Sequence, residues 1–211
     1  MNFEKFAQHA QVENVSRRNL LKGIVAGGGL VLAAPLFPRA AMADGGSVNA
    51  YKTGADGMPG GTVYDPKVYV SIATDGTVTI VTHRSEMGTG SRTSLPMIVA
   101  DEMEADWSRV KIVQAPGDEQ KYGNQDTDGS RSMRHFIQPM RECGAAMRQM
   151  LETAAAAKWG VDVSLCRAKS HHVVQLDAAK KETGTKLGFG ELAEAAMALP
   201  VPPRATLRCR R

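Results

Sequence analysis

The chain has 211 residues, of which 43% are hydrophobic, and a formal net charge of +4; this size and composition support one buried core and exclude wholesale disorder. The positive charge comes from the two ends, because residues 1–43 hold five basic and two acidic side chains and residues 204–211 hold four arginines. The body between them is slightly acidic, which argues against a nucleic-acid-binding protein, since that class has a basic body.

Residues 1–43 have the organisation of an export signal. The charged segment SRRNLLKG at 16–23 precedes an apolar stretch that ends in Ala-Met-Ala at 41–43 and is short for a membrane span, which needs about 20 residues. The pair Arg17-Arg18 resembles the twin-arginine signal, which implies export of a folded protein to the periplasm with cleavage after Ala43. An ordinary secretory signal and a membrane anchor are the alternatives.

The mature part is predicted to begin with a linker at 44–66, which is rich in Gly, Pro, Asp and Ser. Apolar residues then alternate within 68–72 and 78–80, and Asp75-Gly76 between these runs predicts a β-hairpin. A helix is predicted from 92 to 105 with Ser91 as its cap, because the apolar residues at 95, 98, 99 and 103 share one face. Residues 109–115 are predicted to return as a strand.

The second half is predicted to be mainly helical. After a long polar loop at 116–134, a helix of high propensity is expected from 138 to 158 with Pro139 in its first turn. A short hairpin and a last helix at 191–199 follow. This order of elements predicts an α+β fold, a mixed sheet with hairpins packed against helices, rather than a doubly wound sheet. The domain is expected to span 67–203, with 204–211 as a separate basic tail.

Two glycine-containing loops precede predicted helices: residues 86–90, the first glycine loop, and residues 123–135, the second glycine loop. The first N–H groups of a helix lack partners within it and favour an anion, and glycine lets the backbone approach a ligand closely. Gly129, Ser130 and Arg131 add further hydrogen-bond donors. Each loop taken alone can be a structural turn, but two of them together indicate a large ligand with several negative charges.

The segments SEMGTGSRTSLPMIVADEMEADWSRVKIVQAPGD and YGNQDTDGSRSMRHFIQPMRECGAAMRQML resemble the molybdenum-binding subunits of the xanthine dehydrogenase/aldehyde oxidase family, in the isoquinoline 1-oxidoreductase β-subunit branch. The resemblance covers roughly residues 66–203 and implies part of a larger molybdopterin-binding domain. It implies that molybdopterin cytosine dinucleotide is bound by residues of both loops, namely Met87, Gly88, Thr89, Gly90, Gly129, Ser130 and Arg131. Thr89 stands where the family has a longer Gln that contacts a metal oxygen.

The resemblance further implies an oxidoreductase, the N-terminal fragment of an exported molybdenum hydroxylase large subunit that oxidises N-heterocycles or aldehydes. The family's catalytic glutamate lies in a region beyond these 211 residues, so no catalytic residue is assigned and the chain alone is expected to be inactive. Expected partners are the rest of the large subunit, an iron–sulfur small subunit and an electron acceptor such as a cytochrome. Residues 204–211 are expected to lie outside the resemblance, as in a truncated gene product.

Two other functions fit the same residues: a non-catalytic exported module that binds an anion or a partner, and a membrane-anchored assembly factor that keeps residues 1–43. No metal site is predicted from protein side chains. Three cysteines form no CxxC pair, which argues against zinc or a cysteine-bound iron–sulfur cluster in this chain. His171 and His172 are adjacent and point to opposite faces of a strand, and His83 and His135 are expected to be hydrogen-bonded scaffold residues.

We predict that replacing Arg17 and Arg18 together by lysine retains the protein in the cytoplasm. The replacement keeps both charges and removes the guanidinium pair that the twin-arginine resemblance identifies as the signal. Fractionation of cells followed by immunoblotting measures the outcome, and Arg39→Lys, outside the motif, is the matched control that should still be exported. Normal export of the double variant would contradict the interpretation.

Overall fold

The computed structural model describes residue 58 and residues 60–210, all within the second of two units, 1–49 and 50–211. The predicted export signal, its cleavage position after Ala43 and most of the linker at 44–66 lie outside the described residues. Among the described residues, no helix combines the length and the apolar character that crossing a bilayer requires.

The first sheet has three strands, β1 (Val70–Ile72), β2 (Val78–Thr82) and β3 (Val110–Gln114). A short helix, α3 (Pro66–Tyr69), leads into β1, and β1 and β2 form the predicted antiparallel hairpin. β3 pairs with β2 in parallel, because α4 (Ser91–Met103) carries the chain back across the sheet between them. The helix η3 (Trp107–Arg109) precedes β3. The sheet is therefore mixed, as predicted.

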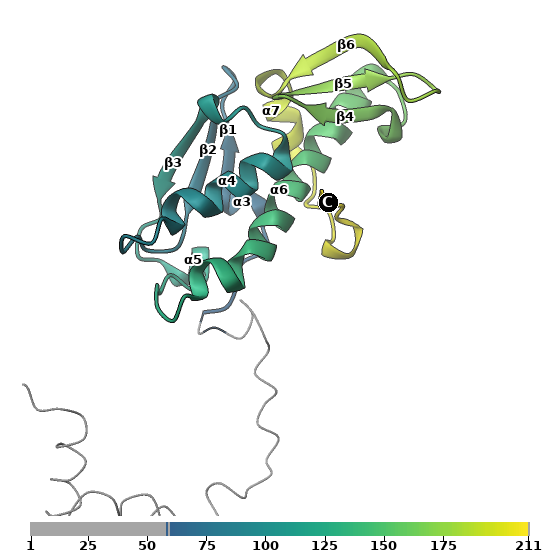
Figure 1. Cartoon of the computed structure of the whole chain (residues 1–211). Coiled ribbons are helices and arrows are strands. Elements are labelled where there is room, and N and C mark those ends of the chain that lie inside the picture. Colours follow the sequence, from purple (N-terminus) through teal and green to yellow (C-terminus); the bar gives the residue numbers. More distant parts are fainter. Residues whose placement is uncertain (1–57, 59, 211) are drawn as a thin grey trace, which may run out of the picture. The chain divides into compact units, whose positions relative to one another are not determined.

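The second sheet is an antiparallel meander of β4 (Cys166–Lys169), β5 (His172–Leu176) and β6 (Glu182–Gly188), preceded by η4 (Val163–Leu165) and followed by α7 (Phe189–Ala198). The sequence predicted a two-stranded hairpin in this region, and the structure has a third strand, β6. Most of β6 is exposed, so its sequence lacks the alternation that marks a half-buried strand. Figure 1 shows this sheet beside the C-terminal end of α6 (Arg131–Trp159). The α+β class is confirmed.

The helices α4 and α6 pack against each other without space for a side chain at Gly144. A Cβ atom there would lie 2.6 Å from the carbonyl oxygen of Val99 and 2.7 Å from the Cβ of Glu102. The predicted apolar face of α4 is confirmed: Leu95, Val99 and Met103 are fully buried, and Ile98 is partly buried against the core. The two longest helices therefore have a fixed spacing, which also fixes where their N-terminal ends lie.

Two predicted helix starts are wrong. Helix α6 begins at Arg131 and not at 138, so Pro139 lies inside it, where it is buried. The helix is longer at its start because Phe136 and Ser132 are buried in the interior. This packing stabilises the first turns more than the low helix propensity of the polar segment before Pro139 destabilises them. Ser91 is the first residue of α4, and the capping position belongs to Gly90. A further short helix, α5 (Glu119–Tyr122), interrupts the polar loop.

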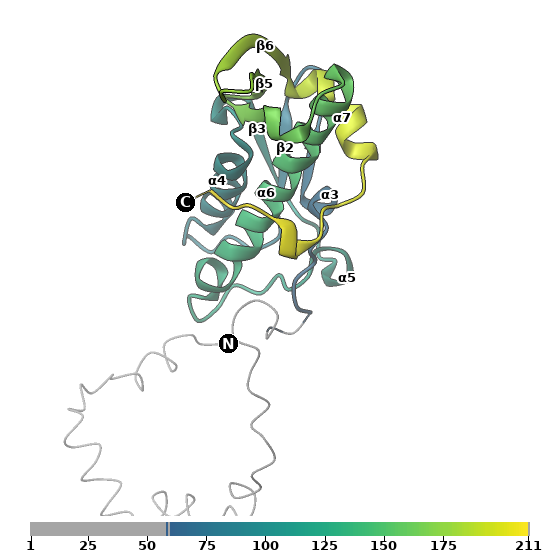
Figure 2. The same cartoon turned by 90° about the vertical axis from the view of Figure 1, so that its right-hand side faces the viewer.

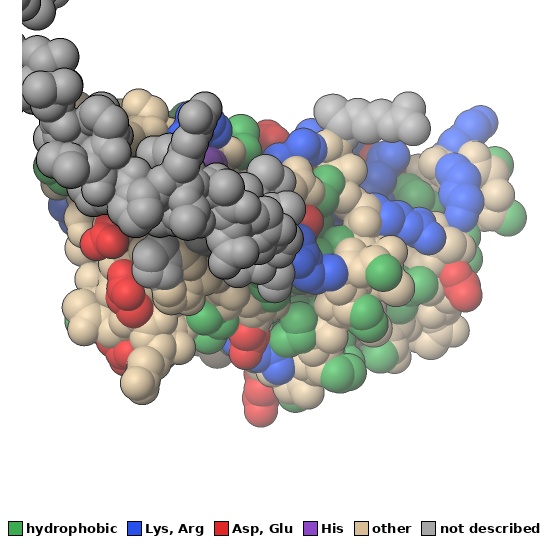
Figure 3. Space-filling view, turned by 90° about the horizontal axis from the view of Figure 1, so that it is seen from below, with side chains coloured by type: hydrophobic (Ala, Val, Ile, Leu, Met, Phe, Trp, Pro, Cys, Tyr) green, Lys and Arg blue, Asp and Glu red, His purple; other side chains and the backbone are tan. Residues whose placement is uncertain are grey.

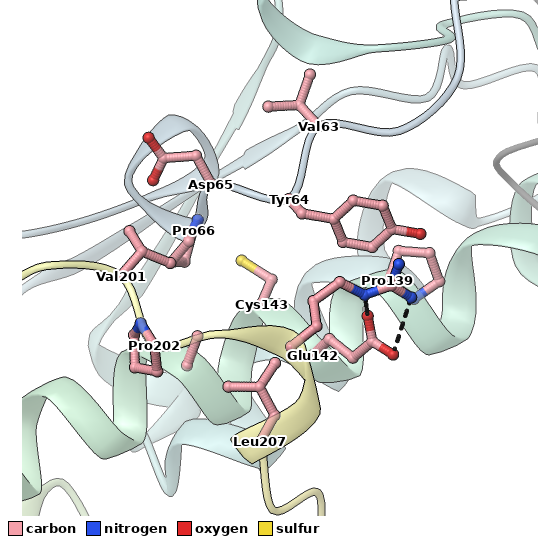
Figure 4. Close-up of a pocket in the computed structure, with 12 residues that line it drawn as sticks. Val63, Tyr64, Asp65, Pro66, Pro139, Glu142, Cys143, Val201, Pro202 and Leu207 are labelled. Atoms are coloured by element: carbon pink, nitrogen blue, oxygen red, sulfur yellow. Dashed lines mark hydrogen bonds and ion pairs between the residues drawn. The ribbon is translucent and has the colours of Figure 1, made fainter.

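Residues 200–210 run back along α6, including η5 (Arg204–Thr206) (Figure 2). Arg204 donates to Glu142 at 2.8 Å and its guanidinium lies 3.7 Å from the ring centre of Tyr64; Figure 4 shows Tyr64 and Glu142 around this contact. The backbone N–H of Arg210 donates at 2.8 Å to buried Glu102, which also pairs with Arg141. The basic tail is thus docked on α4 and α6 through charged contacts.

His83 follows β2 and is buried without hydrogen bonds. Its ring packs against the rings of Tyr69 and Phe136, with centroids 5.3 and 4.9 Å away. Neither ring nitrogen has a partner among the described residues, and the same holds for Nδ1 of His135, so the expectation of hydrogen-bonded scaffold histidines is wrong at these atoms. Burial lowers the pKa of His83 to about 3, and the neighbouring charge of Arg84 acts in the same direction.

We predict that the free energy of unfolding falls as the pH decreases below the ordinary histidine pKa of about 6.5. The unfolded chain takes up a proton on His83 near that pH, whereas the folded chain takes it up only near pH 3. The stability that neutral His83 provides is therefore complete above about pH 6.5 and is lost progressively below it. Urea denaturation at about pH 7 and about pH 5 measures the loss, which should be smaller in His83→Met. An equal loss in both proteins would contradict the assignment.

Candidate anion-binding site between two glycine loops

The two glycine loops lie side by side, although 40 residues separate Ser85 from Gln125. The backbone N–H of Ser85 donates to the carbonyl of Gln125 at 3.3 Å, and the hydroxyl of Ser85 donates to the same oxygen at 3.1 Å. The hydroxyl of Thr127 donates to the carbonyl of Ser85 at 2.5 Å. These bonds join the chain just before the first glycine loop to the second glycine loop.

A cavity of about 350 Å³ opens between the loops, within the usual range for small-molecule sites, about 300–1,000 Å³. Five of the nine lining residues have hydroxyl side chains, but most of the exposed wall is apolar and includes two methionines. The lining residues are Met87, Thr89, Ser91, Thr127, Asp128, Gly129, Ser130, Ser132 and Met133. Serine and threonine hydroxyls can donate to an anion and can also accept hydrogen bonds, so these side chains can bind the polar groups of a ligand whose apolar part contacts the rest of the wall.

Four of the seven residues proposed from the sequence line this cavity: Met87, Thr89, Gly129 and Ser130. Gly88 and Gly90 belong to the first glycine loop but do not line the cavity; their φ angles of +88° and +78° are the conformation that glycine adopts without strain. They shape the loop rather than its surface.

Arg131 is the seventh residue, and its guanidinium does not line the cavity. Its Nε donates to Asp128 at 2.8 Å, its terminal nitrogen pairs with the same carboxylate, and Nη1 lies 3.3 Å from the sulfur of Met58. The structure therefore places the Arg131 charge against Asp128, which is itself a lining residue.

The N-terminal ends of α4 and α6 both meet the cavity, through Ser91 and through Ser132 and Met133. At α4 the carboxylate of Glu86 accepts from the backbone N–H groups of Gly90 and Arg92, each at 3.0 Å. These two bonds hold the pKa of Glu86 below its usual value. An internal carboxylate thus already occupies the end of α4.

The end of α6 differs from that of α4. Its capping residue, Ser130, makes no side-chain capping bond and has φ +55°, a conformation uncommon for residues other than glycine. A 29-residue helix directs a positive dipole end toward this point. Of the two helix ends at the cavity, the end of α6 is the one without a side-chain cap and so is the better position for a bound anion.

Arg84 is a further residue of the site that no sequence pattern singled out; it is fully buried two residues after the end of β2. Its Nε donates to the hydroxyl of Ser132 at 3.2 Å, and Nη1 donates to the carbonyl of Asn124 at 2.8 Å. The guanidinium lies 4.5 Å from the ring centre of Phe136. A charged residue at the end of an alternating apolar strand is the signal that could have identified it.

Burial lowers the pKa of Arg84, and the charges of Asp126 and Asp128 oppose this effect. Its Nη2 is buried and has no hydrogen-bond partner among the described residues. The group is still a cation, because the ordinary arginine pKa lies above about 12. A positive charge is therefore fixed inside the protein and bonded to Ser132 in the cavity wall.

His171 has a structural role. Its Nδ1 accepts from the backbone N–H of Asp106 at 3.1 Å, and its Nε2 lies 2.8 Å from the carbonyl of Gly76. Both ring nitrogens are thus used in holding β5 to the first sheet. Within residues 60–210, no group of three or more His, Cys, Asp or Glu side chains is placed to hold a metal ion.

Comparisons with known proteins agree on one family. The model of the molybdopterin cofactor-binding domain matches residues 38–209. The chain is 33% identical over 144 residues to isoquinoline 1-oxidoreductase subunit beta of Brevundimonas diminuta, covering 65% of this chain and 18% of that protein. It is 35% identical over 135 residues to membrane-bound aldehyde dehydrogenase (pyrroloquinoline-quinone) of Gluconacetobacter polyoxogenes, and the alignment covers 64% of this chain and 16% of that protein.

Among solved structures, quinoline 2-oxidoreductase from Pseudomonas putida 86 aligns with 61% of this chain and 16% of its own, at 22% identity and a TM-score of 0.47. The chain thus spans less than a fifth of the length of each of these three relatives. The family match covers most of the chain and includes both glycine loops and the cavity between them. The chain therefore belongs to the molybdopterin cofactor-binding domain family.

Proposed function

We propose that the chain is part of the large subunit of an exported molybdenum hydroxylase and that the cavity between the two glycine loops holds molybdopterin cytosine dinucleotide. The observation that carries the proposal is the convergence of two loops, distant in sequence, on one cavity with five hydroxyl side chains among its lining residues, in a domain of this family. The cavity holds only part of such a ligand, and other parts of the subunit supply the remaining contacts.

The residues present fit the pyrophosphate of a dinucleotide. The uncapped end of α6 favours negative charge. Hydroxyls of Ser130 and Ser132 can donate to phosphate oxygens, and Arg84 adds a buried positive charge beside Ser132, which the carboxylates of Asp126 and Asp128 partly offset. Hydroxylation of an electron-poor carbon with oxygen derived from water is the chemistry that the bound group supplies. This chain binds and orients the group.

Thr89 is the residue at which this site departs from the family motif. Its side chain lines the cavity and its hydroxyl lies 3.4 Å from that of Ser91. Threonine is shorter than glutamine, so we propose that Thr89 acts on the nearby part of the ligand through a hydroxyl and leaves contacts at the metal to other residues.

The wider assignments rest on the relatives. Two of them act, by name, on isoquinoline and on an aldehyde, which supports N-heterocycles or aldehydes as substrate classes here. One is named a subunit, which supports partner chains: the rest of the large subunit, an iron–sulfur subunit and an electron acceptor such as a cytochrome. Arg17 and Arg18 support export to the periplasm. We propose that turnover needs these other polypeptides, since the chain spans less than a fifth of such relatives.

We predict that Thr89→Trp lowers the amount of pterin dinucleotide that copurifies with the full chain at least about tenfold. The indole would occupy a cavity of about 350 Å³, and a loss of about 1.4 kcal/mol in binding is enough for a tenfold change. Production in a host that makes the cofactor, followed by mass spectrometry of the released pterin and metal analysis, measures this. Thr93→Trp is the matched control, because Thr93 lies four residues after Thr89, is exposed in the first turn of α4 and does not line the cavity.

Equal pterin content in Thr89→Trp and the unmodified chain would show that the ligand lies elsewhere. If the unmodified chain and Thr93→Trp both bind inorganic phosphates but carry neither molybdenum nor a pterin, the result would instead favour the non-catalytic anion-binding module. The two outcomes separate the position of the site from its ligand.

A further inference from the structure

We propose that Arg84 is a positioning residue for the phosphate groups of the cofactor: its buried guanidinium joins the chain just before the first glycine loop to the second glycine loop and orients the hydroxyl of Ser132 as a donor toward the cavity. The inference rests on the proposed function for the identity of the ligand. The contacts of Arg84 within the chain carry the rest of it.

Arg84 connects the end of β2 to both parts of the second glycine loop. Nη1 bonds to both the carbonyl and the side-chain oxygen of Asn124, which is also fully buried, and Nε bonds to Ser132 eight residues later. Phe136 lies against the guanidinium one turn further along α6. Arg84 therefore holds the start of the second glycine loop, just after α5, and its entry into α6 against the end of β2.

The hydrogen bond to Ser132 has a direction. Arginine can only donate, so the hydroxyl oxygen of Ser132 must accept from Nε, and its own proton must point elsewhere. Ser132 donates this proton to the hydroxyl oxygen of Thr127, and the two oxygens are 3.4 Å apart. This distance is at the long limit for a hydroxyl hydrogen bond. Thr127 in turn donates to the carbonyl of Ser85 at 2.5 Å. Arg84, Ser132 and Thr127 thus form a chain of donors, of which the last two line the cavity.

A phosphate oxygen in the cavity would give the Ser132 proton a stronger acceptor than Thr127 at 3.4 Å. A hydroxyl that accepts from a cation becomes a better donor, because hydrogen bonds in a chain polarise one another. Phosphate only accepts when fully ionised, so an oriented donor matches it. The same geometry would disfavour a ligand that presents only donors.

The burial of Arg84 is itself a reason to expect an anion. The carboxylates of Asp126 and Asp128 act on its charge only electrostatically, since the hydrogen bonds of Arg84 go to neutral groups. Its Nη2 has no partner within the described part of the chain. Burying a charge without a directly bonded counter-ion is costly. An anion bound nearby would offset that cost, so binding and the position of Arg84 should depend on each other.

The test uses inorganic pyrophosphate as the probe and the full 211-residue chain, with binding measured by isothermal titration calorimetry and stability by thermal denaturation. Ser132→Ala keeps Arg84 and removes the oriented hydroxyl; we expect binding to weaken about tenfold, the scale of one hydrogen bond to a charged group. Arg84→Lys keeps the charge and loses the Nε donor, so a similar weakening is expected. Lys111→Met changes the net charge by one at an exposed position on β3 and should bind like the unmodified chain.

The double variant Arg84→Lys/Ser132→Ala distinguishes a positioning role from a merely structural one. If Arg84 acts through Ser132, the double variant should bind about as well as the weaker single variant, because both changes remove the same donor. If the fold-losses in pyrophosphate affinity of the two single variants multiply in the double variant, the inference is overturned. It is also overturned if Ser132→Ala binds pyrophosphate like the unmodified chain, or if the unmodified chain does not bind pyrophosphate. Should Arg84→Lys fail to fold, Ser132→Ala alone still decides.

The outcomes for the ligand are separate. If the unmodified chain binds pyrophosphate with this coupling but carries no pterin when made in a cofactor-producing host, the role of Arg84 stands and the proposed function fails. If pterin copurifies and is unaffected by Ser132→Ala, the proposed function stands and the inference about Arg84 fails.

Discussion

Arg84 places a guanidinium group in the interior at the point where β2 ends, and Asn124, Ser132 and Phe136 surround it. These three residues span the second glycine loop and the first turns of α6, so Arg84 attaches both ends of that loop to the end of β2, beside the bonds of Ser85 with Gln125 and Thr127. A buried cation has few stable positions, because each of its donors needs an acceptor. The position of the cavity wall at Ser132 therefore depends on this contact.

The packing of α4 on α6 supplies the second constraint. Their approach at Gly144 leaves no space for a Cβ atom, so the helices act as one rigid pair whose N-terminal ends reach the same cavity. The two ends are not equivalent, since Glu86 caps α4 whereas α6 has no side-chain cap. A domain that binds a dinucleotide through this cavity therefore has one end of the helix pair closed by its own carboxylate and the other open to a phosphate.

Much of this could be predicted from the sequence, and the rest depended on tertiary contacts. The hairpin at Asp75-Gly76 and the apolar face of α4 were predictable because they follow from local turn chemistry and periodicity. The start of α6 was missed because burial of Ser132 and Phe136 overrides the propensity of a polar segment. Met87, Thr89, Gly129 and Ser130 were placed through a family resemblance. Arg84 was missed because its partners lie about 40 residues away, which no local pattern records.

Hydrogen–deuterium exchange on the full chain, with and without the cofactor's dinucleotide, tests most directly whether both glycine loops form one site. The account predicts that backbone amides of 86–91 and of 127–133 gain protection together on binding, while the amides of β6 stay unchanged. Protection of only one loop, or of neither loop while the dinucleotide is bound, would contradict it.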